Sequence, residues 1–430
     1  MTLGPAPALL LTNARLPHGS PADVLLRHGR IEALGPAGGL ETAGGPASGA
    51  ERIDLTGHLL LPAPAEPHCH FDKVLLGGLG GDGRADLESA VAAWYAARST
   101  ATRHEVRDRA LRASSELLAS GATAIRTHVD VGVTTGLLMV EALTEARELL
   151  AGRLELQIVA FVDFPLRGRA GADNRSLLAD ALGAGADVVG GAPYRDDDPP
   201  ACLDILMDMA AEAGRPMDLH TDETLDPASA TLAALAERVL VTGFPHRVTA
   251  SHCVSLGTQP RELVERTAAR VAEAGISVVT CPGTNLYLQG RDRALAVPRG
   301  LTAIAALRAA RVTVAGGGDN ARDPFNPLGR FDPMETASLL VLAGHLSPRS
   351  AYGAVSDAAR TAMGLPRTRI ASGAPAELLA VRADTLADAM ADGRADRMVF
   401  HRGRLVCRTR HERTFPAGIP GGHPARGTAP

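Results

Sequence analysis

The sequence predicts an α/β protein, a (β/α)8 TIM barrel joined to a small β-sandwich domain that both ends of the chain build. Its 430 residues suit a barrel of about 250 residues with a second, smaller unit. In the middle of the chain, short apolar segments alternate with amphipathic helical stretches, as in a parallel barrel. Strand-like segments bounded by turn residues occupy both ends, so we expect one composite domain there.

The expected strands of the terminal domain come from opposite ends of the sequence. Gly and Pro residues separate them, and they are Leu9–Leu11, Asp23–Leu26, Arg30–Leu34, Leu378–Val381 and Met398–Val406. We therefore expect residues 1–60 and 366–415 to form the composite β-sandwich and residues 61–365 to form the barrel. The Pro- and Gly-rich residues 416–430 are expected to be a disordered tail.

Eight apolar segments are the expected barrel strands, and helical patterns such as Leu137–Leu150 and Arg261–Ala274 lie between them. Such alternation of strands and helices favours a parallel sheet. In chain order the strands are Leu59–Leu61, Thr123–His128, Gln157–Phe161, Val188–Gly190, Met217–His220, Val248–His252, Val278–Cys281 and Val312–Gly316.

Composition excludes several classes of function. The formal net charge is −4 and basic residues form no run, so nucleic-acid binding has no electrostatic basis. We read no signal peptide and no run of about 18 apolar residues that would span a membrane. The five cysteines are odd in number and scattered, which makes a disulfide framework unlikely and the cytoplasm the expected compartment. The sequence leaves open whether the chain forms a homo-oligomer.

Polar and titratable residues stand where six of the expected strands end. In a parallel barrel, active sites lie on the face where the carboxyl ends of the strands meet, so we expect these side chains to converge there. They are His68 and His70 after the first strand, His128 at the second, Asp163 after the third, His220 with Glu223 at the fifth, His252 at the sixth and Asp319 after the eighth.

The pair His68 and His70 indicates a metal site. Residues two apart in an extended segment point the same way, so both imidazoles face the barrel mouth while Cys69 points away. With a third imidazole from His220 and the Asp319 carboxylate, the set suits one divalent transition metal, Zn or Fe.

Seven motifs follow one another in order over nearly the whole chain: Pro67-His68-Cys69-His70-Phe71-Asp72, Thr127-His128-Val129-Asp130, Leu156-Gln157-Ile158-Val159-Ala160-Phe161, His220-Thr221-Asp222-Glu223, Thr249-Ala250-Ser251-His252, Leu288-Gln289-Gly290-Arg291 and Gly318-Asp319. Together they resemble the cytosine deaminase branch of the amidohydrolase superfamily, including its N-isopropylammelide hydrolases. The resemblance implies a barrel with a split β-sandwich. It also implies that the metal ligands are His68, His70, His220 and Asp319 and that His252 lies near the metal-activated water.

The same resemblance assigns catalytic roles. Asp319 would accept the water's proton, Glu223 would protonate the ring nitrogen and then the leaving amine, and His252 would steady the attacking oxygen. Many superfamily members hold two metals bridged by a carboxylated lysine on the fourth strand. The single lysine of this chain is Lys73, so we expect one metal per chain.

Some positions depart from cytosine deaminases and bear on the substrate. Asp163 stands where a pyrimidine-reading glutamine is expected, and an ionised aspartate only accepts hydrogen bonds; the alternative is that it turns away, toward Arg167. Asp72-Lys73 and the stretch Gly318-Asp319-Asn320-Ala321-Arg322-Asp323 are closer to the N-isopropylammelide hydrolases, which lack the glutamate at position 223. Asn320 and Phe325 are candidate substrate contacts, with ordinary packing the alternative for Phe325.

Lys73 has two interpretations. In the first, the one lysine of an arginine-rich chain fills a site that needs a compact ammonium, paired with Asp72 or with an anionic group of the substrate. Alternatively, it is an ordinary surface residue.

We therefore expect a hydrolytic deaminase of a small heterocycle, namely an amino-substituted pyrimidine, a triazine or a cyclic guanidine-like ring. A metal-activated water would attack the amino-bearing carbon and release ammonia. The enzymatic alternative is a cyclic amide or N-alkylamine hydrolase of the same superfamily. A non-catalytic binding homologue is the third possibility, and ammonia release from a panel of heterocycles separates the three.

Overall fold

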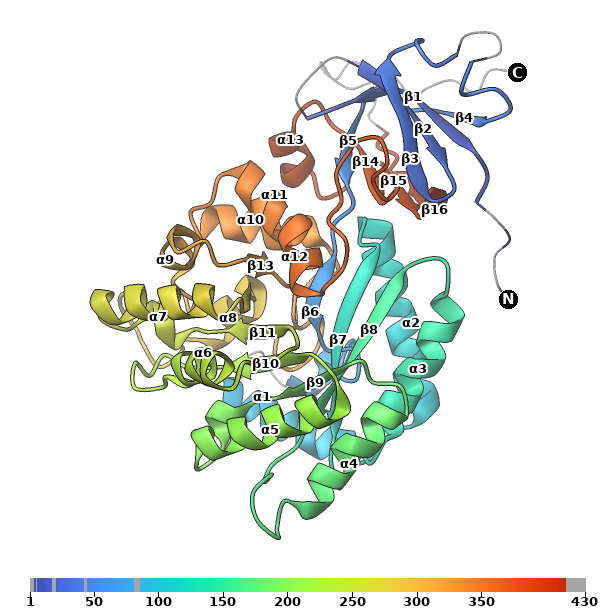
Figure 1. Cartoon of the computed structure of the whole chain (residues 1–430). Coiled ribbons are helices and arrows are strands. Elements are labelled where there is room, and N and C mark those ends of the chain that lie inside the picture. Colours follow the sequence, from blue (N-terminus) through green and yellow to red (C-terminus); the bar gives the residue numbers. More distant parts are fainter. Residues whose placement is uncertain (1–3, 5, 18–20, 42–44, 81–85, 415–430) are drawn as a thin grey trace.

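The computed structural model describes residues 4, 6–17, 21–41, 45–80 and 86–414. Figure 1 shows a barrel surrounded by helices and, at one end of it, a sheet drawn in the colours of both termini. The predicted fold class, a TIM barrel with a smaller β unit built from both ends of the chain, is confirmed. The predicted tail, residues 416–430, lies outside the described residues.

The barrel sheet contains eight parallel strands that follow one another in chain order. Seven of the eight expected strands overlap them. Apolar residues such as Ile125, Val129 and Leu219 belong to the main hydrophobic core, and they alternate with buried polar residues such as Arg126 and Asp218. They are β6 (Glu66–Cys69), β7 (Ala124–Val131), β8 (Glu155–Val162), β9 (Val188–Gly191), β10 (Met217–Thr221), β11 (Val248–His252), β12 (Ser277–Thr280) and β13 (Val314–Gly316).

The prediction that Leu59–Leu61 is the first barrel strand is wrong. It lies in β5 (His58–Pro62), which pairs antiparallel with β14 (Leu378–Arg382) in the terminal sheet. The first barrel strand is β6, whose sequence Glu-Pro-His-Cys carries no apolar run. His68 is therefore part of the strand, and His70 follows it directly.

The seam between the first and last barrel strands is closed by the segments that carry the expected metal ligands. Cys69 and Asp319 form a parallel bridge, and the Asp319 amide donates to the His68 carbonyl over 2.8 Å. The closing contacts of the barrel thus fix His68 and Asp319 relative to each other.

Helices cover the outside of the barrel, and local sequence sets their ends. Helix α2 (Arg103–Ser120) begins with a capping box between Thr102 and Glu105 and ends at Gly121, which adopts a left-handed φ of 116°. The other barrel helices are α3 (Leu138–Leu150), α4 (Ala172–Gly183), α5 (Pro199–Ala213), α6 (Thr231–Thr242), α7 (Arg261–Glu273), α8 (Pro282–Leu288), α9 (Ile304–Ala309), α10 (Pro333–Leu342), α11 (Pro348–Val355) and α12 (Asp357–Ala362).

Some short elements lie near the mouth of the barrel. Helix α1 (Leu87–Arg98) precedes α2, and its N-cap Asp86 forms a capping box with Ser89. The single-turn helices are η1 (Gly77–Gly80), η2 (Pro193–Arg195) and η3 (Ser255–Gly257).

The terminal sheet mixes strands from both ends of the chain, in the order β16-β15-β14-β5-β1-β2-β3 with β4 beside β1. Its own core includes Leu11, Val24, Leu26 and Phe400. Besides β5 and β14, the elements are β1 (Leu9–Arg15), β2 (Pro21–Arg27), β3 (Arg30–Pro36), β4 (Glu51–Asp54), α13 (Leu386–Ala391), β15 (Arg397–His401) and β16 (Arg404–Thr409).

Among the described residues, no helix combines the length and the apolarity that a membrane crossing requires. The cysteines are all unpaired, and Cys407 is the most exposed of them.

Candidate active site

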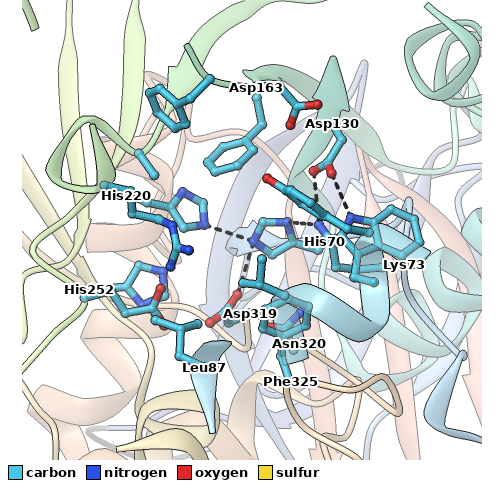
Figure 2. A pocket seen from close by; sticks show the side chains of 18 of the residues that line it. His70, Lys73, Leu87, Asp130, Asp163, His220, His252, Asp319, Asn320 and Phe325 are labelled. Atoms are coloured by element: carbon cyan, nitrogen blue, oxygen red, sulfur yellow. Dashed lines mark hydrogen bonds and ion pairs between the residues drawn. The ribbon is translucent and has the colours of Figure 1, made fainter. Parts of the chain in front are cut away.

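A cavity opens at the carboxyl ends of the barrel strands. Imidazoles and carboxylates line its floor, among them His70, His220, His252 and Asp319, which Figure 2 shows together. Aromatic side chains from α1, β8 and the loop after it, η2 and the loop after β13 line its walls; they are Trp94, Tyr95, Phe161, Phe164, Tyr194 and Phe325. A cavity with flat apolar walls and a few convergent polar groups suits a planar heterocycle.

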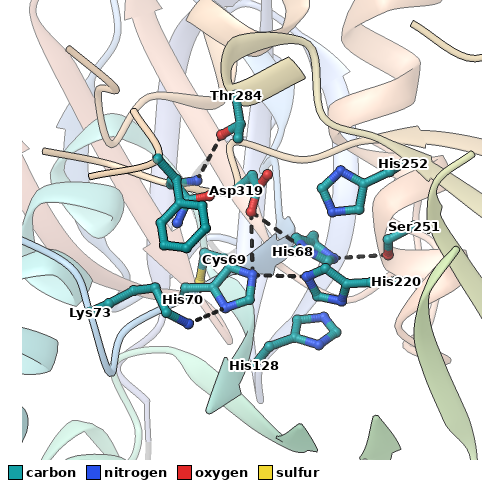
Figure 3. Close-up of polar contacts among 12 residues, drawn as sticks. His68, Cys69, His70, Lys73, His128, His220, Ser251, His252, Thr284 and Asp319 are labelled. Carbon is teal, nitrogen blue, oxygen red and sulfur yellow. Dashed lines mark hydrogen bonds and ion pairs between the residues drawn. The ribbon is translucent and has the colours of Figure 1, made fainter. Parts of the chain in front are cut away.

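Four side chains expected to bind a metal converge at the bottom of this cavity (Figure 3). The Nε2 atoms of His70 and His220 are 3.1 Å apart, and Asp319 Oδ1 lies 3.4 Å from His70 Nε2 and 3.5 Å from His68 Nε2. A tetrahedral ion with ligands at about 2.0–2.1 Å separates neighbouring ligand atoms by about 3.3 Å. The observed spacings match that arrangement.

The ligand atoms are also buried and unsatisfied. His68 Nε2 and both Asp319 carboxylate oxygens have no hydrogen-bond partner in the described part of the chain, although such burial is costly. Burial lowers the pKa values of His70 and His220 well below the usual range, which keeps these imidazoles neutral and able to bind a metal. The residues present therefore fit a divalent transition metal.

The backbone of the strand ends is strained at the site. His252 and Asp319 both have positive φ values, 68° and 61°, which non-glycine residues seldom adopt. Such conformations cluster at functional sites because the surrounding structure holds them. Cys69 points away from the cavity as predicted, and its thiol donates to the Arg126 carbonyl.

Glu223 and His252 form a second group beside the ligand cluster. Glu223 Oε1 lies 3.3 Å from His252 Nδ1, and the Asn285 side-chain nitrogen lies 3.3 Å and 3.2 Å from these two atoms. Burial raises the pKa of Glu223 well above its usual value, and the nearby Asp319 carboxylate adds to the rise. Burial lowers the pKa of His252 to about 4. The two shifts favour the protonated form of Glu223 and the neutral form of His252.

Comparison with known proteins decides the family. The profile of the "Amidohydrolase family" matches residues 97–407. The chain belongs to the amidohydrolase family. It is a hydrolase of carbon–nitrogen bonds, and its family is metal-dependent.

Relatives of this amidohydrolase act on several heterocycles. A pterin deaminase of Rhizobium rhizogenes is 34% identical over 402 residues, which cover 90% of this chain and 88% of the relative. The structure of a 5-methylcytosine deaminase from Klebsiella pneumoniae superposes with a TM-score of 0.84 at 29% identity, covering 95% of this chain and all of the other. An N-isopropylammelide isopropylaminohydrolase from Burkholderia multivorans has a TM-score of 0.80 at 32% identity, with coverages of 94% and 98%.

Lys73 is a buried residue of the cavity wall, so the surface interpretation is wrong. Its Nζ lies 3.1 Å from His70 Nδ1, 3.2 Å from Asp72 and 3.4 Å from Asp130, and 5.1 Å from the centre of the Trp94 ring. The expected pairing with Asp72 is present. Burial alone lowers the pKa of Lys73, but the two carboxylates outweigh it and hold the pKa above its usual value.

We expect Lys73→Arg to reduce kcat/KM of the amidohydrolase roughly tenfold or more, about 1.4 kcal/mol of transition-state stabilisation. The reason is steric, because a planar guanidinium does not fit the space that a compact ammonium occupies among His70, Asp72 and Asp130. Steady-state kinetics and thermal unfolding check this, with the surface replacement Arg238→Lys as the control. Unchanged kinetics and stability would show that the ammonium has no special role.

Asp163 pairs with Arg98, not with Arg167. The Arg98 guanidinium donates to both Asp163 oxygens over 2.9 and 2.6 Å, while Arg167 pairs with Asp196. Asp163 still borders the cavity (Figure 2). Each carboxylate oxygen has two acceptor positions, so one remains on each for another donor.

The other predicted residues occupy distinct positions. Asn320 and Phe325 border the cavity, but the Asn320 amide donates to Asp323 over 2.9 Å. Phe325 also packs beside Leu288. His128 lies beneath the cavity, its ring centre 4.1 Å from that of His68.

Sequence reasoning missed Trp94, Arg98, Tyr194 and Asn285. The first two lie on α1, where Trp94 Nε1 and Arg98 both donate to Asp130. An arginine in a helical segment is usually predicted to lie on the surface. No local sequence pattern predicts that α1 lies over the barrel mouth. Asn285 lies on α8, which follows the seventh strand, and no titratable residue at the end of that strand indicated a functional site.

Proposed function

We propose that this amidohydrolase hydrolytically removes the amino group from a planar nitrogen heterocycle, with one divalent transition metal per chain. The observation that carries the proposal is the buried Glu223–His252–Asn285 group directly beside the ligand cluster. A protein that only binds a ring needs no buried proton donor next to a metal site.

His68, His70, His220 and Asp319 would hold the metal. When bound, a divalent transition metal makes hydroxide available near neutral pH and acts as a Lewis acid. The alternative two-metal arrangement needs a lysine on β9, and that strand reads Val-Val-Gly-Gly. These points support a mononuclear centre.

Three side chains at the ligand cluster have different roles in the proposed reaction. The Asp319 carboxylate accepts the proton of the attacking water. Glu223, whose pKa burial raises, delivers its proton to the ring nitrogen beside the reacting carbon. The second proton of the water, released as the carbonyl forms, would pass through Glu223 to the leaving amine, and the proton on Asp319 would then restore the Glu223 acid. His252 Nε2 has no protein partner among the described residues, so it is available to hydrogen-bond the attacking oxygen.

We infer that the ring carries an amino group on a carbon between ring nitrogens, as in a 2-aminopteridine. Two features support this. The cavity has aromatic walls on several sides, and Asp163 and Asp130 turn acceptors toward it, which favours a ring edge with N–H donors. The pterin deaminase at 34% identity, matched over most of both chains, has a name consistent with this class.

Release of an alkylamine is the second candidate. The structural relative from Burkholderia multivorans, an N-isopropylammelide isopropylaminohydrolase, is 32% identical. Loss of an alkylamine and loss of ammonia need the same attack on a ring carbon. The two reactions differ only in the leaving group.

The test is a product assay with metal-loaded protein on aminopteridines, aminopyrimidines, aminotriazines and N-isopropylammelide. We expect ammonia from an aminopteridine, with kcat/KM above about 10⁴ M⁻¹s⁻¹, and little alkylamine. Alkylamine as the main product would favour the second candidate. Neither product from any ring would contradict both.

Asp163 provides a prediction about substrate choice. We expect the wild-type protein to be poor on cytosine, because a carboxylate opposite the ring carbonyl repels it, and an unpaired buried polar group costs about 1–3 kcal/mol. Asp163→Gln should raise the ratio of kcat/KM for cytosine to that for the aminopteridine.

Asp204→Asn is the control, because it breaks an arginine pair on the surface instead of in the cavity. Efficient turnover of cytosine by the wild-type protein would refute this role of Asp163.

A further inference from the structure

A continuous chain of hydrogen bonds runs beneath the ligand cluster, inside the barrel. Arg126 on β7 donates to Asp218 Oδ2 over 2.7 Å, and the Ser251 hydroxyl on β11 donates to Asp218 Oδ1 over 3.0 Å. The same hydroxyl oxygen lies 2.8 Å from Nδ1 of His68 on β6 (Figure 3). All four side chains are at most 3% exposed, and Asp218 belongs to β10.

The chemistry of the groups fixes the direction of every proton in this chain. A guanidinium only donates and a carboxylate only accepts, so Arg126 makes Asp218 an acceptor. Ser251 has one hydroxyl proton, which it donates in its hydrogen bond to Asp218. The oxygen of Ser251 can then only accept from His68, which places the imidazole proton on Nδ1. His68 Nε2 therefore carries the lone pair.

We propose that Ser251, Asp218 and Arg126 are positioning residues that hold His68 in the tautomer and orientation able to bind the metal. His68 Nε2 is the atom that faces Asp319, at 3.5 Å, and it has no hydrogen-bond partner in the described chain. The Arg126 guanidinium at one end of the chain thus fixes the direction of each hydrogen bond, so that the lone pair of His68 is on Nε2 at the other end. The inference rests on the proposed metal site.

Within the described part of the chain, neither of the other two histidine ligands has a hydrogen-bond acceptor at Nδ1. His220 Nδ1 has no hydrogen-bond partner among the described residues. The contact of His70 Nδ1 is with Lys73, which is itself a donor group. Asp218 Oδ1 is 3.8 Å from His128 Nε2, which is beyond hydrogen-bond distance. The Ser251 chain therefore acts on His68.

The test measures metal affinity by chelator competition on the whole protein, with thermal unfolding of the metal-free form as a check of the fold. We expect Ser251→Ala to weaken metal binding roughly 10–100-fold. Ser251→Thr keeps a hydroxyl and should restore affinity to within a few-fold of wild type. Ser114→Ala, which removes a buried hydroxyl from α2, should change nothing.

Asp218→Asn tests the direction of the protons at nearly constant shape. Its amide can donate to Ser251, which then donates to His68 Nδ1 and moves the imidazole proton to Nε2. We expect a loss of metal affinity at least as large as in Ser251→Ala.

Two results would overturn the proposal. One is wild-type affinity in Ser251→Ala, and the other is equal weakening in Ser251→Ala and Ser251→Thr, which would indicate packing alone. Should Asp218→Asn fail to fold, the serine pair still decides. A wild-type protein without stoichiometric metal would instead refute the metal site itself, so the two failures are distinct.

Discussion

Glu223→Gln will reduce turnover by about 10²–10⁴-fold and leave the metal content unchanged. The substitution keeps the size of the side chain and its contacts with Asn285 and His252. It removes the acidic carboxyl group, whose pKa burial raises well above its usual value. Kinetics and elemental analysis on one preparation give both quantities.

A matched control is Glu262→Gln, which makes the same change near the start of α7, outside the cavity. It should leave both turnover and metal content intact. Full activity in Glu223→Gln would remove this residue from the mechanism.

His220→Asn will lose most of its metal and all measurable activity. His220 supplies the nitrogen 3.1 Å from His70 Nε2, and a cluster that has lost one of four ligands binds a transition metal far more weakly. Equilibrium dialysis against a known free metal concentration measures the change.

The variant His128→Asn distinguishes the proposed ligand set from another possible set, which includes His128. The atoms of His68, His128 and His220 also lie close enough to surround an ion. The proposed set excludes His128, so His128→Asn should retain about one metal per chain. Loss of metal in this variant, with retention in His220→Asn, would replace the proposed set by the other one.

The sequence predicted most of the barrel because seven of its strands contribute apolar residues to the main hydrophobic core and alternate with helical stretches in the chain. It missed β6 because Glu66–Cys69 contains no such run. The hydrophobic signal is absent from this strand because it carries His68, a predicted metal ligand, and the buried carboxylate Glu66.

The floor of the site was predictable because strand ends of a parallel barrel meet on one face. Its walls were not, since Trp94 and Arg98 reach the cavity only through the placement of α1 across the barrel mouth. The same placement gives Asp163 its partner, Arg98, which is 65 positions away in the chain. Sequence reasoning considered Arg167 instead because it is near in sequence. Tertiary partners of this kind leave no local pattern.

The most direct test of the account is a mass balance of one reaction. Protein loaded with one equivalent of metal is incubated with a 2-aminopteridine in ¹⁸O-labelled water, and a chelated sample is run in parallel. We expect equal amounts of ammonia and of the 2-oxo product, one ¹⁸O atom in that product, and no reaction in the chelated sample. Unreacted ring, or equal turnover after removal of the metal, would contradict it.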